Sequence, residues 1–373
     1  MAESSITVRS GELVAWRLFD IAYAIDLTRA ELCWFPYADE GRRSRLSTAP
    51  PKALAFGVPP LELPLDPVNL LLDGEPVTGR VSVRLYDFGV AAFAVRVAVE
   101  EAAWNTFAAR FNALDRALGP SAPDAFWLEM RARLCAAIVP ALDRPSSDAS
   151  LQEDYLLGTV RSLSEPLEAS ALSERVDLAA LLSGETRKLS DAARRDLLAH
   201  SHSYYADDLV LLTWDRAFIY EPRGDSDVAD VIEVANAQLV EFRYYDALLD
   251  DELPRMYARV QAARGAGSLL AARRFAHLAR GLHMLVAEAT ELTEKVDNAL
   301  QVTEDVYLAR VYSAALGLFR VPALSASVDR KLAIIRDTYA ALYEEASSWR
   351  SEWLEIAIVL LIVLEVVLTL LRY

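Results

Sequence analysis

The chain has 373 residues, 53% of them hydrophobic and 25% charged, a balance that suits one large or two medium globular domains. This composition excludes a disordered, collagen-like or disulfide-stapled small protein. The formal net charge of −16 repels phosphate backbones, so direct nucleic-acid binding is disfavoured. Cys33 and Cys135 are too far apart in sequence for a metal knuckle, which indicates a reducing compartment and no disulfide framework.

Residues 12–100 are typical of strands and turns. Two segments, 13–27 and 81–99, are rich in β-branched and aromatic residues, and proline-rich turns lie between them. Asp87 and Gly89 in the second segment favour a hairpin turn or bulge over a catalytic site.

Helices and further strands are predicted after residue 100. Apolar residues at helical spacing predict helices at 102–118, 123–142, around 176–182 and at 190–200, whereas 155–160 and 209–214 have the pattern of strands. Strands that bracket helices in this order predict an α+β domain over residues 1–224.

Beyond Asp225 the pattern predicts helices and no strand. One long helix starts at Val228 and is ended or kinked by Pro254, and a second runs from about Ser268 to Phe319. We therefore expect a helical domain at 225–350 with an antiparallel helical hairpin.

The third helix carries a heptad seam, in which apolar residues alternate steps of four and three, as in a coiled coil. The seam consists of Val328, Leu332, Ile335, Tyr339, Leu342, Ala346, Trp349 and Trp353. As a stalk from Val328 to Arg350 it would be about 34 Å long and would support a homo-oligomer. The alternative, that these helices pack on the α+β domain, stays open.

The C-terminal residues 353–371 read WLEIAIVLLIVLEVVLTLL and predict a single transmembrane helix of about 28 Å. Thirteen Ile, Val and Leu side chains contribute on the order of −6 kcal/mol to insertion, against about +3 kcal/mol for a central carboxylate. Glu355 sits at the expected interface, whereas Glu365 lies near mid-depth and must be neutral or paired. Without a secretory signal at the N-terminus, we expect a tail anchor with the bulk of the chain in the cytoplasm.

Motifs for chemistry are sparse. The sequence holds no phosphate-binding loop, dinucleotide fingerprint, GxSxG elbow or HExxH, so no catalytic residue, cofactor or metal is predicted. His200 and His202 precede Asp207 and Asp208, but this segment favours a solvated turn over a metal site.

The densest polar pattern lies in the first long helix. Helical spacing places Glu233, Asn236, Arg243 and Asp250 in one stripe, with Tyr244, Tyr245 and Asp246 beside it. Such a stripe favours a hydrogen-bonded network that docks the helix, and an acid–base or phosphate-binding site is the alternative.

A basic tract follows between Pro254 and Val286, which contains six arginines and no acidic residue: Arg255, Arg259, Arg264, Arg273, Arg274 and Arg280. It suits either a docking surface for anionic lipid or an RNA-rich partner, or a solvated helix surface paired with acids elsewhere.

Four segments resemble the YagE / required-for-meiotic-nuclear-division family of unknown function. They are VRLYDFGVAAF, ADDLVLLTWDRAFIYEP, EVANAQLVEFRYYDALLDDEL and SEWLEIAIVLLIVLEVV, in the last of which Glu355 and Glu365 take the family's two acidic positions. The resemblance implies a membrane-anchored protein with an α/β N-terminal part and a helical C-terminal part, and no catalytic residues. Mitochondrial relatives are thought to tether ribosomes at the inner membrane, and the missing presequence suggests a bacterial member.

The leading hypothesis is therefore a tail-anchored scaffold at the bacterial cytoplasmic membrane. It would oligomerise through its helical region and present its α+β domain to a protein or ribosome-associated partner. The alternative is an enzyme for a phosphorylated or nucleic-acid substrate that uses Glu233, Asn236, Arg243 and Asp250. The missing nucleophile and metal set favours the scaffold.

Overall fold

The computed structural model forms two compact units. It describes residues 6–34, 42–43, 54–146, 148–185, 187–224, 227–264, 277, 280–284, 286–287, 289–291, 294, 300–302 and 305–371. The first unit comprises residues 1–244 and 295–322, and the second comprises residues 245–294 and 323–373.

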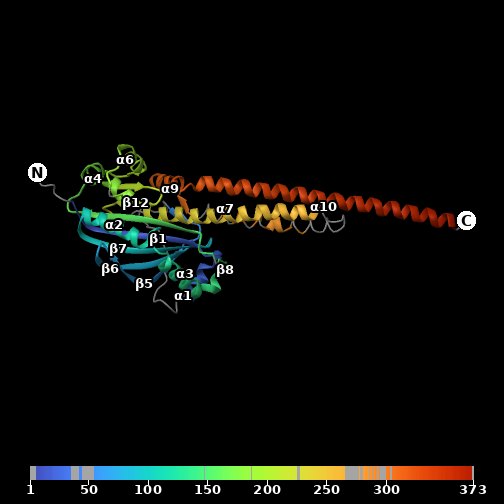
Figure 1. Cartoon of the computed structure of the whole chain (residues 1–373), viewed down its shortest axis with the longest axis horizontal. Coiled ribbons are helices and arrows are strands. Elements are labelled where there is room, and N and C mark those ends of the chain that lie inside the picture. Colours follow the sequence, from blue (N-terminus) through green and yellow to red (C-terminus); the bar gives the residue numbers. More distant parts are fainter. Residues whose placement is uncertain are drawn as a thin grey trace. The chain divides into compact units, whose positions relative to one another are not determined.

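A nine-stranded mixed sheet forms the centre of the first unit (Figure 1). From edge to edge the strands are β10 (Ser201–His202), β11 (Leu209–Leu212), β12 (Arg216–Tyr220), β9 (Gln152–Leu163), β1 (Thr7–Asp20), β7 (Val90–Ala103), β6 (Glu75–Leu85), β5 (Leu61–Leu72) and β3 (Arg42–Arg43). Strands β12 and β9 pair in parallel, and the other neighbours pair antiparallel. The predicted α+β class is confirmed.

One face of this sheet carries the hydrophobic core. In β1, Leu13, Ala15 and Phe19 point to this face because side chains alternate along a strand, and they join a cluster with Phe107 and Phe111. The last two belong to α2 (Trp104–Leu118), which covers the sheet together with α3 (Ala125–Ile138) and α1 (Leu27–Trp34). The helices predicted at 102–118 and 123–142 are thus confirmed.

The strand-and-turn prediction for 12–100 is wrong over α1. Asp26 precedes this helix, and its Oδ1 accepts a hydrogen bond of 3.0 Å from the Arg29 amide. A capping carboxylate of this kind stabilises a helix start, which overrides the β-rich composition upstream.

Short elements complete the first unit. Strand β2 (Ala22–Ile25) pairs with β8 (Leu142–Pro145), which follows the 3-10 turn η2 (Val139–Ala141). Helices α4 (Ala169–Arg175), α5 (Leu178–Ser183) and α6 (Asp191–Leu197) lie between β9 and β10. The turn predicted at Asp87 and Gly89 is confirmed, since it joins β6 to β7 and the Gly89 amide donates to the Tyr86 carbonyl at 3.1 Å.

The C-terminal third departs from the sequence pattern in two places. Helix α7 (Val228–Arg264) continues through Pro254 rather than ending there. The predicted helix from Ser268 to Phe319 is wrong over β13 (Leu300–Val302), which pairs antiparallel with β4 (Leu54–Phe56). Its last part forms a separate helix, α9 (Val306–Leu318), and residues 265–276 lie outside the described residues.

A helix of 51 residues, α10 (Val321–Leu371), ends the chain. It starts directly after Arg320, whose φ of 59° is not helical and so separates α9 from α10. Pro322 falls in the first turn of α10, where a backbone N–H would have no partner within the helix, so proline is tolerated there. In the second unit the seam residues Val328, Leu332, Ile335 and Leu342 are all at most 6% exposed. The seam therefore packs inside this chain as far as Leu342, and the side chains of 345–354 lie outside the described residues.

Among the described residues, no single helix is long and apolar enough to cross a membrane by itself. The broken pair Val306–Leu318 and Val321–Glu344 meets the length and composition requirement only when taken together. The predicted transmembrane helix at 353–371 is therefore not confirmed and stays a prediction; the side chains of 353, 354 and 370 lie outside the described residues.

Candidate functional site

The sheet face opposite the core carries several charged residues. Arg80, Ser82 and Arg84 alternate along β6 with Val81, Val83 and Leu85, which belong to the core cluster. In the strand register, Arg80 is opposite Arg96 of β7, and Arg84 is opposite Glu62 of β5. Directly opposite side chains share a face, so these four charged residues gather on the same side of the sheet.

Arg84 is the centre of a buried ion-pair network. Its Nη1 lies 2.7 Å from Asp230 Oδ1 and 3.3 Å from Glu233 Oε1, and its Nη2 lies 3.9 Å from Glu62 Oε2. Burial by itself lowers the pKa of Arg84, but the neighbouring Asp230 and Glu233 carboxylates outweigh it and raise that pKa well above its usual value. The guanidinium is thus held charged beneath α7.

Glu233 completes this network from the helix side. Its Oε1 accepts a hydrogen bond of 2.9 Å from the Tyr86 hydroxyl, and the residue is only 2% exposed. Burial raises the pKa of Glu233, and the charge of Arg84 opposes that shift. Because its oxygen is engaged by Arg84 of β6 and by Tyr86 directly after that strand, Glu233 fixes the start of α7 on the sheet.

The remaining residues of the predicted polar stripe have separate partners. Asn236 is buried and donates from Nδ2 to the Ile232 carbonyl of its own helix at 3.0 Å, and Arg243 forms an ion pair with Glu153 of β9. Tyr245 is buried and Tyr244 half-buried. Asn236 and Arg243 thus have other partners than Glu233 has.

Asp246 and Asp250 belong to the second unit and share one cation. Lys331 Nζ of α10 lies 2.7 Å from Asp246 Oδ1 and 2.6 Å from Asp250 Oδ1. Burial raises the pKa of Asp246, but hydrogen bonds from Lys331 and Ser327 outweigh it and lower that pKa overall. The stacking of His283 on Tyr339, with ring centroids 5.4 Å apart, adds a second contact to α10.

The basic tract is described only in part. Arg255 pairs with Glu252 at 2.7 Å and with Asp251 at 3.7 Å, both on its own helix, while Arg259 and Arg280 are exposed. Arg273, Arg274 and the side chain of Arg264 lie outside the described residues. Docking through this tract stays a prediction.

Two adjoining hollows lie on the charged face of the sheet. The first, here called the polar groove, has a volume of about 410 Å³ and is lined by Glu12, Glu62, Arg80, Ser82, Arg96 and Arg161. The second, here called the donor pocket, has a volume of about 110 Å³, and its lining includes Trp16, Arg96, Thr159, Arg161 and Glu221. Glu12, Arg96 and Arg161 line both, so the two hollows adjoin.

These lining residues were not predicted from the sequence as a site. The available signal was the placement of Arg84 and Arg96 within the apolar strand segments VSVRL and VAAFAVRVAV. A charged residue in such a strand indicates a polar face, but the strand register is needed to bring residues of different strands together.

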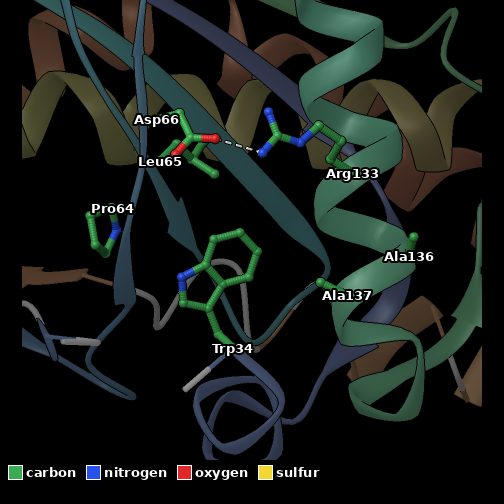
Figure 2. Close-up of a pocket in the computed structure, with 7 residues that line it drawn as sticks. All are labelled: Trp34, Pro64, Leu65, Asp66, Arg133, Ala136 and Ala137. Atoms are coloured by element: carbon green, nitrogen blue, oxygen red, sulfur yellow. Dashed lines mark hydrogen bonds and ion pairs between the residues drawn. The ribbon is translucent and has the colours of Figure 1, made fainter. Parts of the chain in front are cut away.

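A larger cavity lies beside the same part of β5, and Pro64 lines both this cavity and the polar groove. The larger cavity has a volume of about 580 Å³ and is lined by Trp34 of α1, Pro64, Leu65 and Asp66 of β5, and Arg133, Ala136 and Ala137 of α3. Figure 2 shows the Trp34 indole between Pro64 and Ala137, and the ion pair of Asp66 and Arg133 at 2.7 Å. Both ion-pair side chains are more than half exposed, so this cavity has an apolar wall and a solvated polar rim.

Potential metal ligands do not cluster in the described part of the chain. There, no group of three or more His, Cys, Asp and Glu side chains is arranged to hold a metal ion. His202 lies in β10, and burial, with positive charge from His200 and Arg310, lowers its pKa.

Comparison with known proteins identifies a family for the sheet. The family model described as "Uncharacterized protein MJ0711, N-terminal domain" matches residues 10–227. The uncharacterized protein MJ0711 of Methanocaldococcus jannaschii is 24% identical over 243 residues, which cover 65% of this chain and 73% of the archaeal protein. No solved structure matches the chain. The resemblance to YagE proteins stays a prediction, and the matched family is, as that resemblance implied, one without an assigned function.

Proposed function

The chain belongs to the family of the MJ0711 N-terminal domain, and we propose that it is a tail-anchored membrane scaffold whose α+β domain faces a partner in the cytoplasm. The family match covers residues 10–227, which make up nearly all of the α+β domain that the protein would present to its partner. Residues 356–371 at the end of α10 would form the anchor. The partner would be a protein or a ribosome-associated complex, as the resemblance to YagE proteins implies.

The exposed end of α10 is the observation that carries this proposal. The described Ile, Val and Leu side chains from Ile356 to Leu371 are between 45 and 79% exposed, and Glu365 and Thr369 interrupt this apolar surface. Burial of one such side chain is favourable by about 1.5–3 kcal/mol relative to exposure to water, so the exposure of all of them to water is costly. Lipid is the solvent that removes this cost for a helix whose surface is predominantly apolar.

Glu365 lies in the middle of this exposed segment. Thr369 donates from Oγ1 to the Glu365 backbone carbonyl at 2.8 Å and so does not engage the carboxyl group. A carboxyl group at mid-depth needs to be protonated or to meet a polar group of a neighbouring helix. The seam packs inside its own chain as far as Leu342, so its apolar side chains are not free to contact a second copy. We therefore assign self-association to the membrane helix rather than to the stalk.

Membrane fractionation tests the anchor. We compare the full chain, a chain ending at Ser348, the double variant Leu361→Arg/Leu364→Arg and its matched control Leu361→Ala/Leu364→Ala. After alkaline extraction and flotation, the full chain and the alanine variant should remain with membranes, whereas the other two should not. Two central arginines cost about 5–7 kcal/mol of insertion, which cancels the gain from the apolar residues.

Release of the full chain by alkaline extraction, or retention of the chain ending at Ser348, would contradict the anchor. Flotation separates membrane association from aggregation, which would pellet without floating. The scaffold part is tested by crosslinking and purifying the full chain beside an unrelated tail-anchored protein. Enrichment of the same specific partner in replicate purifications supports it, and a partner set identical to the control's contradicts it.

A further inference from the structure

Two arginines on neighbouring strands lie side by side in the polar groove. Arg80 of β6 and Arg96 of β7 are directly opposite in the strand register, an arrangement that is unfavourable for like charges. Arg80 Nη2 is balanced by Glu12 Oε1 at 2.8 Å, whereas Arg96 Nη1 donates to the neutral Ser82 hydroxyl at 2.7 Å and is 3.8 Å from Glu62 Oε1. Arg96 therefore keeps donor capacity towards the groove, since a guanidinium has five N–H groups.

The donor pocket adds further donors around Arg96. Arg161 of β9 is exposed and lines both the pocket and the groove, and Thr159, two residues earlier, contributes a hydroxyl on the same face. Thr159 is opposite Glu12 in the register of β1 and β9, whereas Arg96 is opposite Val14 of β1. Three adjacent strands thus bring two guanidinium groups and a hydroxyl to one small hollow.

Trp16 supplies an independent observation. The residue is 2% exposed and lines the donor pocket, and its indole Nε1 has no hydrogen-bond partner among the described residues. Its ring is fixed by near-parallel packing on Tyr155, with centroids 6.0 Å apart and an angle of 22°. Buried donors without a partner are rare in native proteins, and a bound group with an acceptor oxygen would satisfy this one.

We propose that the donor pocket binds an oxyanion, the phosphate or carboxylate group of a small polar molecule whose remainder occupies the polar groove. Arginine pairs bind such groups through parallel N–H donors, and the indole N–H and threonine hydroxyl complete the donor set. A volume of about 110 Å³ is the space of a few water molecules and suits one such group. The adjoining 410 Å³ carries both charge signs and suits a polar body.

Two carboxylates also line the donor pocket and oppose an anion there: Glu221, and Glu12, which pairs with Arg80. Substitution of Glu221 should therefore change anion binding in the opposite direction to substitution of a donor. Substitution of Glu221 by glutamine removes a negative charge and should tighten anion binding, whereas loss of a donor should weaken it.

Isothermal titration calorimetry on the full chain in detergent tests the site. The probes are inorganic phosphate, sulfate and acetate, each titrated at constant ionic strength against chloride. We expect saturable binding of one phosphate or sulfate per chain. Arg161→Gln should weaken binding at least tenfold, Trp16→Phe threefold to tenfold, and Glu221→Gln should strengthen it several-fold. Arg133→Gln, the same change at an exposed arginine of the larger cavity, is the control and should leave binding unchanged.

The three probes distinguish a phosphate-bearing ligand from a carboxylate. Binding of phosphate and sulfate but not acetate assigns a phosphate-bearing ligand, and equal binding of acetate assigns a carboxylate. Heats no different from chloride for all three probes would overturn the proposal, as would binding that Arg161→Gln and Trp16→Phe leave unaltered. Trp16→Phe keeps an aromatic ring on Tyr155, and circular dichroism of each variant shows whether it is folded. The test is independent of the membrane anchor, since binding in detergent needs no bilayer.

Discussion

The Tyr86 hydroxyl donates a hydrogen bond of 2.9 Å to Glu233 Oε1, an oxygen that also lies 3.3 Å from Arg84 Nη1. The two residues are 147 positions apart, so this contact joins the end of β6 to the first turns of α7. Tyr86, Arg84 and Glu233 are all buried, and each gives another a hydrogen-bond or ion-pair partner. Without such a partner, a buried polar group would destabilise the folded state. The network therefore sets where α7 docks on the sheet.

Removal of Arg84 should be much more damaging than removal of Tyr86's hydroxyl. We expect Arg84→Met to lower the free energy of unfolding by about 3–5 kcal/mol, because it leaves Asp230 and Glu233 without their cation, and Tyr86→Phe by about 1 kcal/mol. The double variant Arg84→Met/Glu233→Met should recover part of the loss. Urea denaturation measures all three, and a cost for Arg84→Met no larger than that of the exposed Arg133→Met would contradict the role of the network.

Asp20 should give the α+β unit a pH-dependent stability. Burial raises the pKa of Asp20 to about 7, although Arg131 opposes the shift. The folded state therefore binds this proton more tightly than the unfolded state does, so the stabilisation is complete below pH 4 and is lost as the pH rises through about 7. The loss is on the order of 4 kcal/mol, from about three pKa units.

Asp20→Asn should remove this component, so that its free energy of unfolding falls less between pH 5 and pH 8 than that of the wild type. Asp66→Asn is the matched control at an exposed carboxylate. Parallel pH profiles for the wild type and Asp20→Asn would show that Asp20 titrates normally.

Two turn glycines should differ sharply in their tolerance of alanine. Gly89 has a φ of 102°, and a Cβ there would lie 1.9 Å from the Ala22 carbonyl oxygen. Gly74, in the hairpin between β5 and β6, has a φ of 82° but meets no atom within 4 Å. We expect Gly74→Ala to cost about 1 kcal/mol from backbone strain alone, and Gly89→Ala to cost at least 3 kcal/mol or to prevent folding. Thermal denaturation compares them, and equal melting temperatures would be the contrary result.

Local patterns in the sequence predicted much of the sheet and its covering helices. Helix α2 follows from Trp104, Phe107 and Phe111 at helical spacing, all of which are buried. Strand β11 follows from its apolar run. Strand β13 could not be predicted this way, because Leu300–Val302 becomes a strand only by pairing with Leu54–Phe56, some 245 residues earlier in the chain.

The candidate site was harder to predict than the fold. The helical spacing of Glu233, Asn236 and Arg243 is correct, yet Glu233 turns to Arg84 and Tyr86 of the sheet and Arg243 to Glu153 of β9. Helix periodicity gives the face of a residue but not its partner on another element. The donor pocket likewise depends on the register of three strands, which alternation alone does not supply.

Topology labelling tests the membrane anchor most directly. In a chain with Cys33→Ala and Cys135→Ala, single cysteines are placed at Ser348, Leu364 and Tyr373, and cells are treated with a membrane-impermeant maleimide before and after lysis. The account predicts that position 373 reacts in intact cells, that position 348 reacts once the cytoplasmic face is exposed, and that position 364 reacts only after detergent. Reaction of position 364 in intact membranes at the rate of position 348 would contradict it.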